Sequence, residues 1–270
     1  MDQFIVTETC STLRELGREA LRGKWKLAFF AYMVYYAVIY IPLVILMAFF
    51  KPVEVFDLTM YGMYFLFVLL IAGPLTLGCS IFALSIFRNE EASIGQIFYG
   101  FERFGKALGL ALLVTLFVIL WFLIPVAGLA LGVIAAFKYS QVFFIMADNP
   151  DIGIVECIAR SKHIMDGNKA KLFVLELTFI GWGILASIPT AMLEVMARND
   201  PMMLLSPGYH LISFVLSAGF MFLMAYVMVT TAGFYEMASG LLRPGVIATT
   251  AEIVEEKIEE KIEENAEDER

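Results

Sequence analysis

The sequence predicts an all-α polytopic membrane protein with six transmembrane helices. Two observations lead to this fold class: apolar runs long enough to cross a bilayer, and Lys and Arg residues that gather on one side of those runs. The composition agrees, because 60% of the 270 residues are hydrophobic and only 17% are charged. An average water-soluble domain contains about 25% charged residues.

The apolar runs have the length that a membrane-spanning helix needs, about 20 residues for a hydrocarbon core about 30 Å thick. The longest run, 107–147, carries a single charge, Lys138, and as one helix it would be about twice too long. Pro125 and Gly128 interrupt helix continuity within it. Whether the turn Ile124–Gly128 crosses fully or is re-entrant stays open. We expect spans at about 27–50, 62–87, 107–124, 129–147, 172–194 and 211–235.

Lys and Arg residues set the orientation, because cytoplasmic flanks of membrane proteins retain them. With both termini cytoplasmic, the inner segments hold 16 of the 19 Lys and Arg residues, and the outer loops hold Lys51 and Arg198. We therefore expect a protein of the cytoplasmic membrane with both termini inside. The basic part of residues 1–26 abuts a full-length span without a small-residue cleavage site, so no cleaved signal peptide is expected.

The net charge of −8 belongs mainly to the C-terminal end, since the last nineteen residues hold ten acids and three bases. Such a charge block is usually a solvated tail. We expect an N-terminal segment at 1–11, a membrane domain at 12–245 and an acidic cytoplasmic tail at 246–270. The chain is not basic enough to indicate a nucleic-acid partner.

Three of the spans follow an amphipathic helix with a capping signal at its start, and we expect these helices to lie in the cytoplasmic interface. Each helix is followed by a glycine and a lysine at the mouth of the next span. Three copies of this unit indicate an internal repeat, with three hairpins of one orientation related by parallel pseudo-symmetry. The alternative is that any interfacial helix ends this way where it enters a membrane. The helices are at about 12–22, 93–104 and 150–165, followed by Gly23 and Lys24, Gly105 and Lys106, and Gly167 and Lys169.

Residues 100–107, GFERFGKA, contain the G-x-x-x-x-G-K pattern of a phosphate-binding loop. That loop needs a buried strand before it and a Ser or Thr after its lysine, but the residue after Lys106 is Ala107. Apolar residues at helical spacing place this stretch in an amphipathic helix instead. We expect no nucleotide, and we expect Lys106 to reach lipid headgroups.

Catalytic and metal-binding patterns are scarce. His163 and His210 fall on opposite sides of the membrane in this topology, so they cannot share a site. Cys10, Cys79 and Cys157 form no C-x-x-C pair and lie far apart, so we expect neither a zinc site nor a disulfide framework but unpaired thiols in a reducing compartment. We expect no enzymatic activity, no metal and no cofactor.

Two ionisable residues, Lys138 and Glu176, fall inside predicted spans, where a charge costs at least about 2.5 kcal/mol unless it is paired or hydrated. Helical rise separates them by about 7.5 Å along the membrane normal, a gap that a lysine stem can close. The hypothesis is a pair inside the bundle. It is either an ion, solute or lipid-headgroup site, or else a structural salt bridge or two separately snorkelling chains. The candidate polar site comprises Lys138, Tyr139, Ser140, Gln141 and Glu176.

One face of the first span carries Tyr32, Tyr36 and Tyr40 at helical spacing. It is as good a lipid or partner surface as a lumen lining. The second apolar run contains GPLTLG, Gly73–Gly78, in its middle.

Three stretches in combination resemble a known family: FYGFERFGKALGLALL at 98–113, ADNPD at 147–151 and HIMDGNKAKLFVLELTFIGW at 163–182. They are similar to the bacterial multi-pass membrane proteins catalogued as domain of unknown function 975. The resemblance covers roughly residues 12–240 and leaves the acidic tail outside. It implies a polytopic membrane protein without an established activity, and it gives no catalytic residue to carry over.

The first function hypothesis is a non-enzymatic membrane protein that binds lipids or partner membrane proteins at the cytoplasmic leaflet. Self-association is one form of such partnership. Anionic lipids attract nearby cations at about 1 kcal/mol each. The alternative is a small transporter or channel for an ion, solute or lipid, with a site near Lys138 and Glu176. A conduit needs polar residues through the full bilayer depth, and the third span offers only Thr115, which favours the first hypothesis. Candidate headgroup contacts are Arg14, Arg18, Arg22, Lys24, Lys26, Arg103, Lys106, Lys169 and Lys171.

Overall fold

The computed structural model of the chain describes residues 4–50, 58–125, 127–198 and 200–242. The predicted acidic tail, 246–270, lies outside these residues. The described ranges contain helices and no strand. The elements are α1 (Cys10–Ala20), α2 (Trp25–Phe50), α3 (Leu58–Phe87), the 3-10 helix η1 (Ile94–Arg103), α4 (Phe104–Phe122), α5 (Gly128–Lys138), α6 (Val142–Asp148), α7 (Ile154–Ile164), α8 (Lys169–Ala197), the 3-10 helix η2 (Pro201–Leu205), α9 (Pro207–Leu216) and α10 (Ala218–Ala238).

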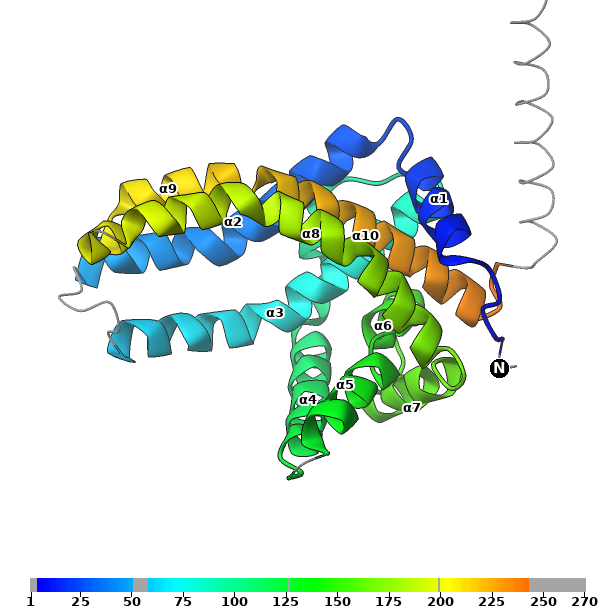
Figure 1. The fold of residues 1–270 in the computed structure, drawn as a ribbon. Helices are drawn as coiled ribbons and strands as arrows, with labels where there is room; N and C mark the ends of the chain where they lie inside the picture. The colour runs from blue at the N-terminus through cyan, green and yellow to red at the C-terminus, as the bar shows by residue number, and fades with distance from the viewer. Residues whose placement is uncertain (1–3, 51–57, 126, 199, 243–270) are drawn as a thin grey trace, which may run out of the picture.

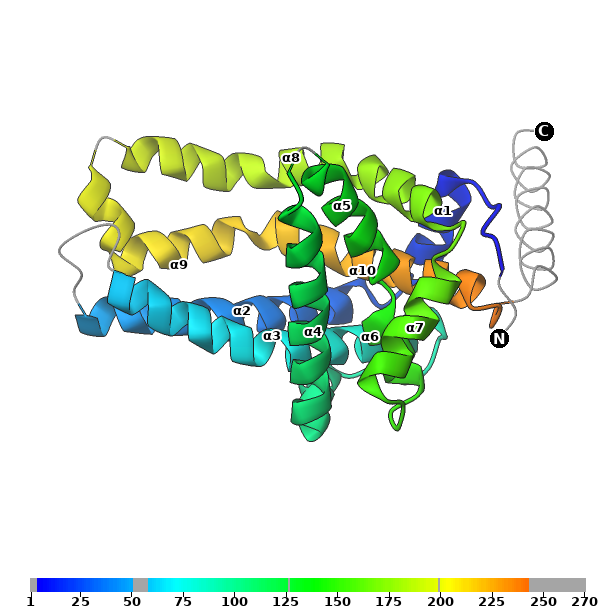
Figure 2. The same ribbon diagram turned by 90° about the horizontal axis from the view of Figure 1, so that it is seen from below.

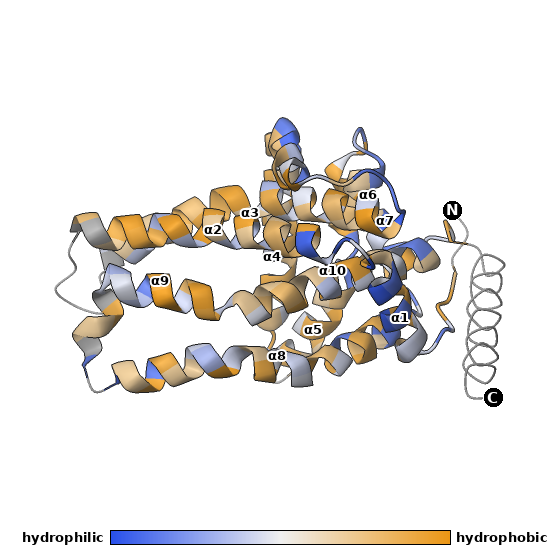
Figure 3. Cartoon of the chain, turned by 90° about the horizontal axis from the view of Figure 1, so that it is seen from above, coloured by the Kyte–Doolittle hydropathy of each residue, from blue (hydrophilic) through white to orange (hydrophobic). Residues whose placement is uncertain are grey.

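Six helical stretches are long and apolar enough to cross a membrane, which confirms the predicted fold class at this level. Hydrophobic residues dominate along these helices (Figure 3), as expected where lipid surrounds them. The third stretch begins at Ile94 instead of Ala107, because η1 continues directly into α4. The six candidate spans are Trp25–Met47, Thr59–Phe87, Ile94–Phe122, Gly128–Asp148, Lys169–Ala197 and Ala218–Ala238.

Helices α2, α3 and α8 and the α9–α10 pair form an elongated bundle (Figures 1 and 2). Helix α4 crosses the direction of this bundle, and α5 returns toward it beside α8. We call the end that holds α1, α7 and the last turns of α3, α6 and α10 the terminal end, because the first described residues lie there. The distal end holds the end of α8, η2 and the start of α9.

The second and third candidate spans make close backbone contact. Helix η1 packs against the middle of α3, where a Cβ added at Gly78 would overlap the carbonyl oxygen of Ile97. A Cβ at Gly100 would overlap the carbonyl oxygen of Pro74 in the same way. Gly78 of the GPLTLG stretch and Gly100 of η1 therefore have a packing role, since a side chain at either glycine would push the two backbones apart.

Two of the three predicted glycine junctions have helix-terminating geometry. Gly23 has a φ of 77° and Gly167 a φ of 76°, each three residues after the last residue of α1 or α7. Such a left-handed residue ends a helix, and glycine adopts it without steric cost. The structure differs at Gly105, which was expected to end a helix. It lies inside α4 because the 3-10 helix passes into α4 without a turn.

The apolar core is uneven along the molecule. A large cluster of buried side chains runs from Val6 to Ala238 and includes none of the buried residues between 180 and 222. A separate small cluster, Leu193, Ala197 and Tyr209, holds the distal end. Helix packing is therefore concentrated at the terminal half of the molecule.

Candidate functional site

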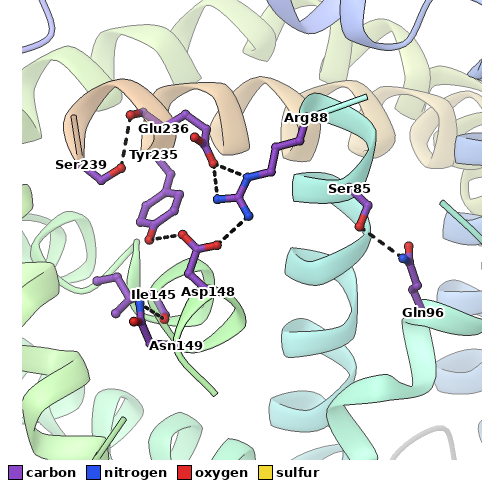
Figure 4. Close-up of polar contacts among 9 residues, drawn as sticks. All are labelled: Ser85, Arg88, Gln96, Ile145, Asp148, Asn149, Tyr235, Glu236 and Ser239. Atoms are coloured by element: carbon purple, nitrogen blue, oxygen red, sulfur yellow. Dashed lines mark hydrogen bonds and ion pairs between the residues drawn. The ribbon is translucent and has the colours of Figure 1, made fainter. Parts of the chain in front are cut away.

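Three candidate spans end in one polar cluster at the terminal end of the molecule (Figure 4). Arg88 follows the last residue of α3, Asp148 is the last residue of α6, and Tyr235 and Glu236 lie in the final turn of α10. The second, fourth and sixth candidate spans thus each contribute to it. We refer to these four residues as the three-helix cluster.

Every contact in the three-helix cluster is a short, directed bond. Arg88 Nη1 lies 2.7 Å from Asp148 Oδ1, and Arg88 Nε and Nη2 donate to Glu236 Oε1 at 2.7 and 2.5 Å. The hydroxyl of Tyr235 donates to Asp148 Oδ2 at 2.8 Å. The Asp148 and Glu236 side chains are only 13% and 6% exposed. Charge-assisted hydrogen bonds of this kind fix the orientation of the helices that carry them.

The Arg88 guanidinium keeps its charge in this setting. Burial on its own lowers the pKa of Arg88, but the bonds to Asp148 and the charge of Glu236 outweigh burial and raise that pKa above its ordinary value. The cation is shared by the Asp148 and Glu236 carboxylates, and Asp148 also accepts a hydrogen bond from the Tyr235 hydroxyl, so the cluster is well satisfied. It acts as a clamp between helices and does not expose a reactive group.

The predicted intramembrane polar residues mark a break in the fourth candidate span. Helix α5 ends at Lys138 and α6 begins at Val142. Two backbone carbonyls at the break are satisfied from α7: Ser161 Oγ donates to the Lys138 carbonyl at 3.0 Å, and Cys157 Sγ donates to the Val142 carbonyl at 2.9 Å. Helix α7 therefore stabilises an interruption that would be costly in lipid.

The side chains at this break are enclosed by protein. Gln141 is fully buried, and its Nε2 donates to Ser140 Oγ at 3.0 Å. Its Oε1 is buried without a hydrogen-bond partner in the described part of the chain. Tyr139 is buried, and Lys162 Nζ lies 5.7 Å from the centre of its ring, within reach of a cation–π interaction.

The structure does not join Lys138 to Glu176. Glu176 is exposed on α8, and none of the ion pairs within the described ranges connects the two residues. The expected pair assumed one continuous helix through Lys138, whereas the chain turns at that residue. Residues 138–141 therefore lie together at the break, and Glu176 forms no ion pair with Lys138.

The predicted headgroup contacts fall into three groups with different surroundings. Near the start of α4, Lys106 Nζ donates to the carbonyls of Pro150 and Asp151 at 3.3 and 3.2 Å, which ties it to the loop before α7. At the α1–α2 junction, Arg14 Nε and Lys24 Nζ are buried and have no hydrogen-bond partner among the described residues. Among the described residues, these are the two cationic side chains with a buried nitrogen that lacks a hydrogen-bond partner.

The third group lies at the start of α8, beside a groove of about 710 Å³ between α5 and α8. Lys169 is the charged residue of its lining and bonds to Asp166 Oδ1 at 3.0 Å. Phe137 and Phe173 meet edge-to-face across the two helices, with ring centroids 5.5 Å apart. The lining comprises Leu129, Ala130, Val133, Ile134, Phe137, Gly167, Lys169, Ala170 and Phe173.

The N-terminus of α8 lies at the end of this groove and has no side-chain cap. Asn168 occupies the N-cap position, but its side chain bonds elsewhere. Its Oδ1 accepts from the Val6 amide at 2.9 Å, and its Nδ2 donates to the carbonyls of Phe4 and Ile164 at 2.7 and 2.8 Å. Free amides and the helix dipole leave partial positive charge at this end of the groove.

Comparison with models of protein families identifies the family of this chain. The model of a family described as a protein of unknown function, DUF975, matches residues 7–132 and 125–241. The chain belongs to the DUF975 family. No curated protein and no solved structure matches it. Membership confirms the resemblance seen in the sequence, and it assigns no activity to any residue of the three-helix cluster or the groove.

Sequence reasoning missed the three-helix cluster in this DUF975 chain. Arg88 counted only as one of the inner positive charges, and Asp148 appeared only within the ADNPD stretch of the family resemblance. The signal was present in part, because both residues border a span on the same predicted side. Within the described ranges, no group of three or more His, Cys, Asp or Glu side chains could hold a metal ion.

Proposed function

We propose that this DUF975 protein is a non-enzymatic membrane protein that binds anionic phospholipid at the cytoplasmic leaflet. In this proposal the terminal end faces the cytoplasm, the acyl chain lies in the groove between α5 and α8, and the phosphate sits at Lys169. The groove, with its cation at one end, is the observation that carries the proposal.

The lining of the groove fits the two chemical parts of a phospholipid. Its apolar side chains offer an acyl chain van der Waals contact along two helices. At the other end, Lys169 and the uncapped start of α8 both favour a negative group. The bond between Lys169 and Asp166 is an exposed pair, which contributes little, so a phosphate can compete with it.

The α1–α2 junction supports the same orientation. It has the glycine geometry of the α7–α8 junction, and Arg14 Nε and Lys24 Nζ are buried there without a hydrogen-bond partner among the described residues. We take these junctions as two copies of one unit that faces anionic headgroups, with the spans arranged as hairpins of one orientation. Arg18, Arg22, Lys26 and Lys171 would add to the positive field there.

A second candidate function is a small transporter or channel, favoured by the break at residues 139–141. Helices interrupted within the membrane form the substrate sites of many transporters, and Gln141 Oε1 is free to accept a hydrogen bond. Proteoliposomes would show a flux of ions or solutes that Gln141→Leu abolishes. Flux equal to that of protein-free vesicles would remove this candidate.

The lipid-binding proposal is tested by native mass spectrometry of the full chain purified in detergent and titrated with phosphatidylglycerol or phosphatidylcholine. We expect Lys169→Ala to weaken phosphatidylglycerol binding about fivefold, as loss of about 1 kcal/mol of attraction predicts, and to leave phosphatidylcholine binding unchanged. Ala130→Phe should block the groove, whereas Ala136→Phe on the same helix, outside the groove lining, serves as its control. Equal binding of phosphatidylglycerol by all four proteins would contradict the proposal.

A further inference from the structure

The tyrosine face of the first span lines a second, separate cavity. It has a volume of about 310 Å³ and lies between α2, α3 and α10, away from the α5–α8 groove. The tyrosines divide along this face: Tyr32 and Tyr36 line the cavity, whereas Tyr40 bonds to His210. The remaining lining is Tyr35, Ile39, Thr76, Cys79, Phe220, Met221, Met224 and Met228.

The lining contains one buried hydroxyl, that of Tyr32, without a hydrogen-bond partner among the described residues. Tyr32 is 3% exposed. Four other tyrosines, at positions 40, 64, 226 and 235, do have partners for their hydroxyls. The large majority of buried side-chain polar atoms are paired, so the Tyr32 hydroxyl indicates a partner that the described residues do not supply.

The chemistry of the lining defines the missing partner. The wall is apolar and aromatic, with three methionines that adapt to irregular shapes. A hydroxyl that makes no hydrogen bond to its neighbours is able to donate to a carbonyl oxygen of a ligand. Tyr32 lies about 10 Å along α2 from Trp25, within the candidate span Trp25–Met47, so the partner has to be soluble in lipid.

We propose that this cavity binds a lipid-soluble carbonyl compound, whose oxygen accepts a hydrogen bond from Tyr32 and whose apolar body packs among Tyr36, Phe220 and the methionines. Its volume lies at the lower limit of ligand pockets, which begin at about 300 Å³. An acyl ester and a quinone both present the required carbonyl. The site is independent of the groove at Lys169, so either can be correct without the other.

The test measures binding of two probes, methyl decanoate and decylubiquinone, to the full chain in detergent by their effect on thermal unfolding. We expect one of them to raise the melting temperature, which identifies the source of the carbonyl. Tyr32→Phe should weaken that binding about fivefold, as expected for one hydrogen bond, and should raise the melting temperature of the ligand-free protein because it removes an unpaired buried hydroxyl.

Two further variants separate ligand binding from folding. Met224→Trp fills the cavity and should abolish binding while the protein still unfolds cooperatively. Tyr64→Phe is the matched control, because the Tyr64 hydroxyl already donates to the Ile39 carbonyl; it should lower the ligand-free melting temperature and leave probe affinity unchanged. Binding of neither probe would overturn the proposal. A Tyr32→Phe protein that is less stable without ligand and binds both probes as the wild type does would overturn it equally.

Discussion

The two ends of this molecule are built differently, although the same long helices connect them. At the terminal end, the three-helix cluster, the Asn168 bonds to the N-terminal segment and the large apolar core all lie together. At the distal end, three buried residues form the core, and one polar chain runs from Tyr40 through His210 to the Leu204 carbonyl. Fixed geometry is therefore concentrated at the end that carries the proposed lipid site.

The distal contact also has a defined proton arrangement. His210 Nε2 lies 2.8 Å from the Leu204 carbonyl oxygen and must donate to it, so in the neutral ring Nδ1 accepts from Tyr40 at 2.8 Å. Burial lowers the pKa of His210 below its ordinary value. A neutral hydrogen-bonded chain thus links the segments of the distal end, whereas charge-assisted bonds from Arg88 link the helices of the terminal end.

The largest effect is expected when the three-helix cluster is broken. Arg88→Ala leaves the Asp148 and Glu236 carboxylates buried without their cation, and removal of one partner of such a pair costs about 3 kcal/mol or more. Arg198→Ala at the distal end removes an exposed arginine and should change stability by less than about 0.5 kcal/mol. Unfolding of both variants in detergent measures the difference, and similar losses would refute the contrast between the two ends.

A second variant tests how the N-terminal segment is held. Asn168→Ala removes three hydrogen bonds from a fully buried side chain and should cost about 2 to 3 kcal/mol. Limited proteolysis should then cleave before Cys10, where the wild type resists. Asn149→Ala, which loses one long bond of 3.4 Å, is the control. Unchanged protection in the Asn168 variant would show that other contacts hold the segment.

Alanine substitutions at two glycines of α3 compare how tightly the helix is packed toward its two ends. Gly78→Ala forces α3 away from the Ile97 carbonyl and should destabilise the protein by about 2 kcal/mol. Gly62→Ala, nearer the distal end, meets no described atom within 4 Å and should be neutral or stabilise by up to about 1 kcal/mol. The account of close η1–α3 packing fails if thermal unfolding ranks the two variants in the opposite order.

The smallest effect is a pH dependence at the distal end. The pKa of His210 is lower in the folded state than in the unfolded state. The neutral ring therefore adds fully to the free energy of unfolding above the unfolded pKa of about 6.5, and this stabilisation is lost as the pH falls through the folded pKa. His210→Gln should remove this step from the pH profile of stability. Tyr40→Phe should cost about 1 kcal/mol at neutral pH. A step that persists in His210→Gln would assign it to another group.

Local signals made part of this fold predictable from the sequence. Apolar runs of bilayer length gave the six candidate spans, because hydrocarbon thickness sets helix length. The junctions at Gly23 and Gly167 were predictable because a left-handed residue after a helix favours glycine. Both kinds of signal lie within a few residues of the feature that they predict.

Features that depend on distant partners were not predictable. The Arg88–Glu236 bond joins residues 148 positions apart, and neither residue differs locally from any other charge beside a span. The expected ion pair between Lys138 and Glu176 is not formed, and this too depends on tertiary structure. Helical rise gives the depth of a residue along one helix, but it does not predict that the helix ends at Lys138. Tertiary geometry decides which charges meet.

Hydrogen exchange of the full chain in nanodiscs tests the central claim most directly, with phosphatidylglycerol compared against phosphatidylcholine at equal bilayer thickness. The account predicts that phosphatidylglycerol slows exchange at residues 12–26 and 160–172, around the two glycine junctions, and leaves residues 200–216 at the distal end unchanged. Slowed exchange at the distal end alone, or equal exchange in the two lipids throughout, would contradict binding of anionic lipid at the terminal end.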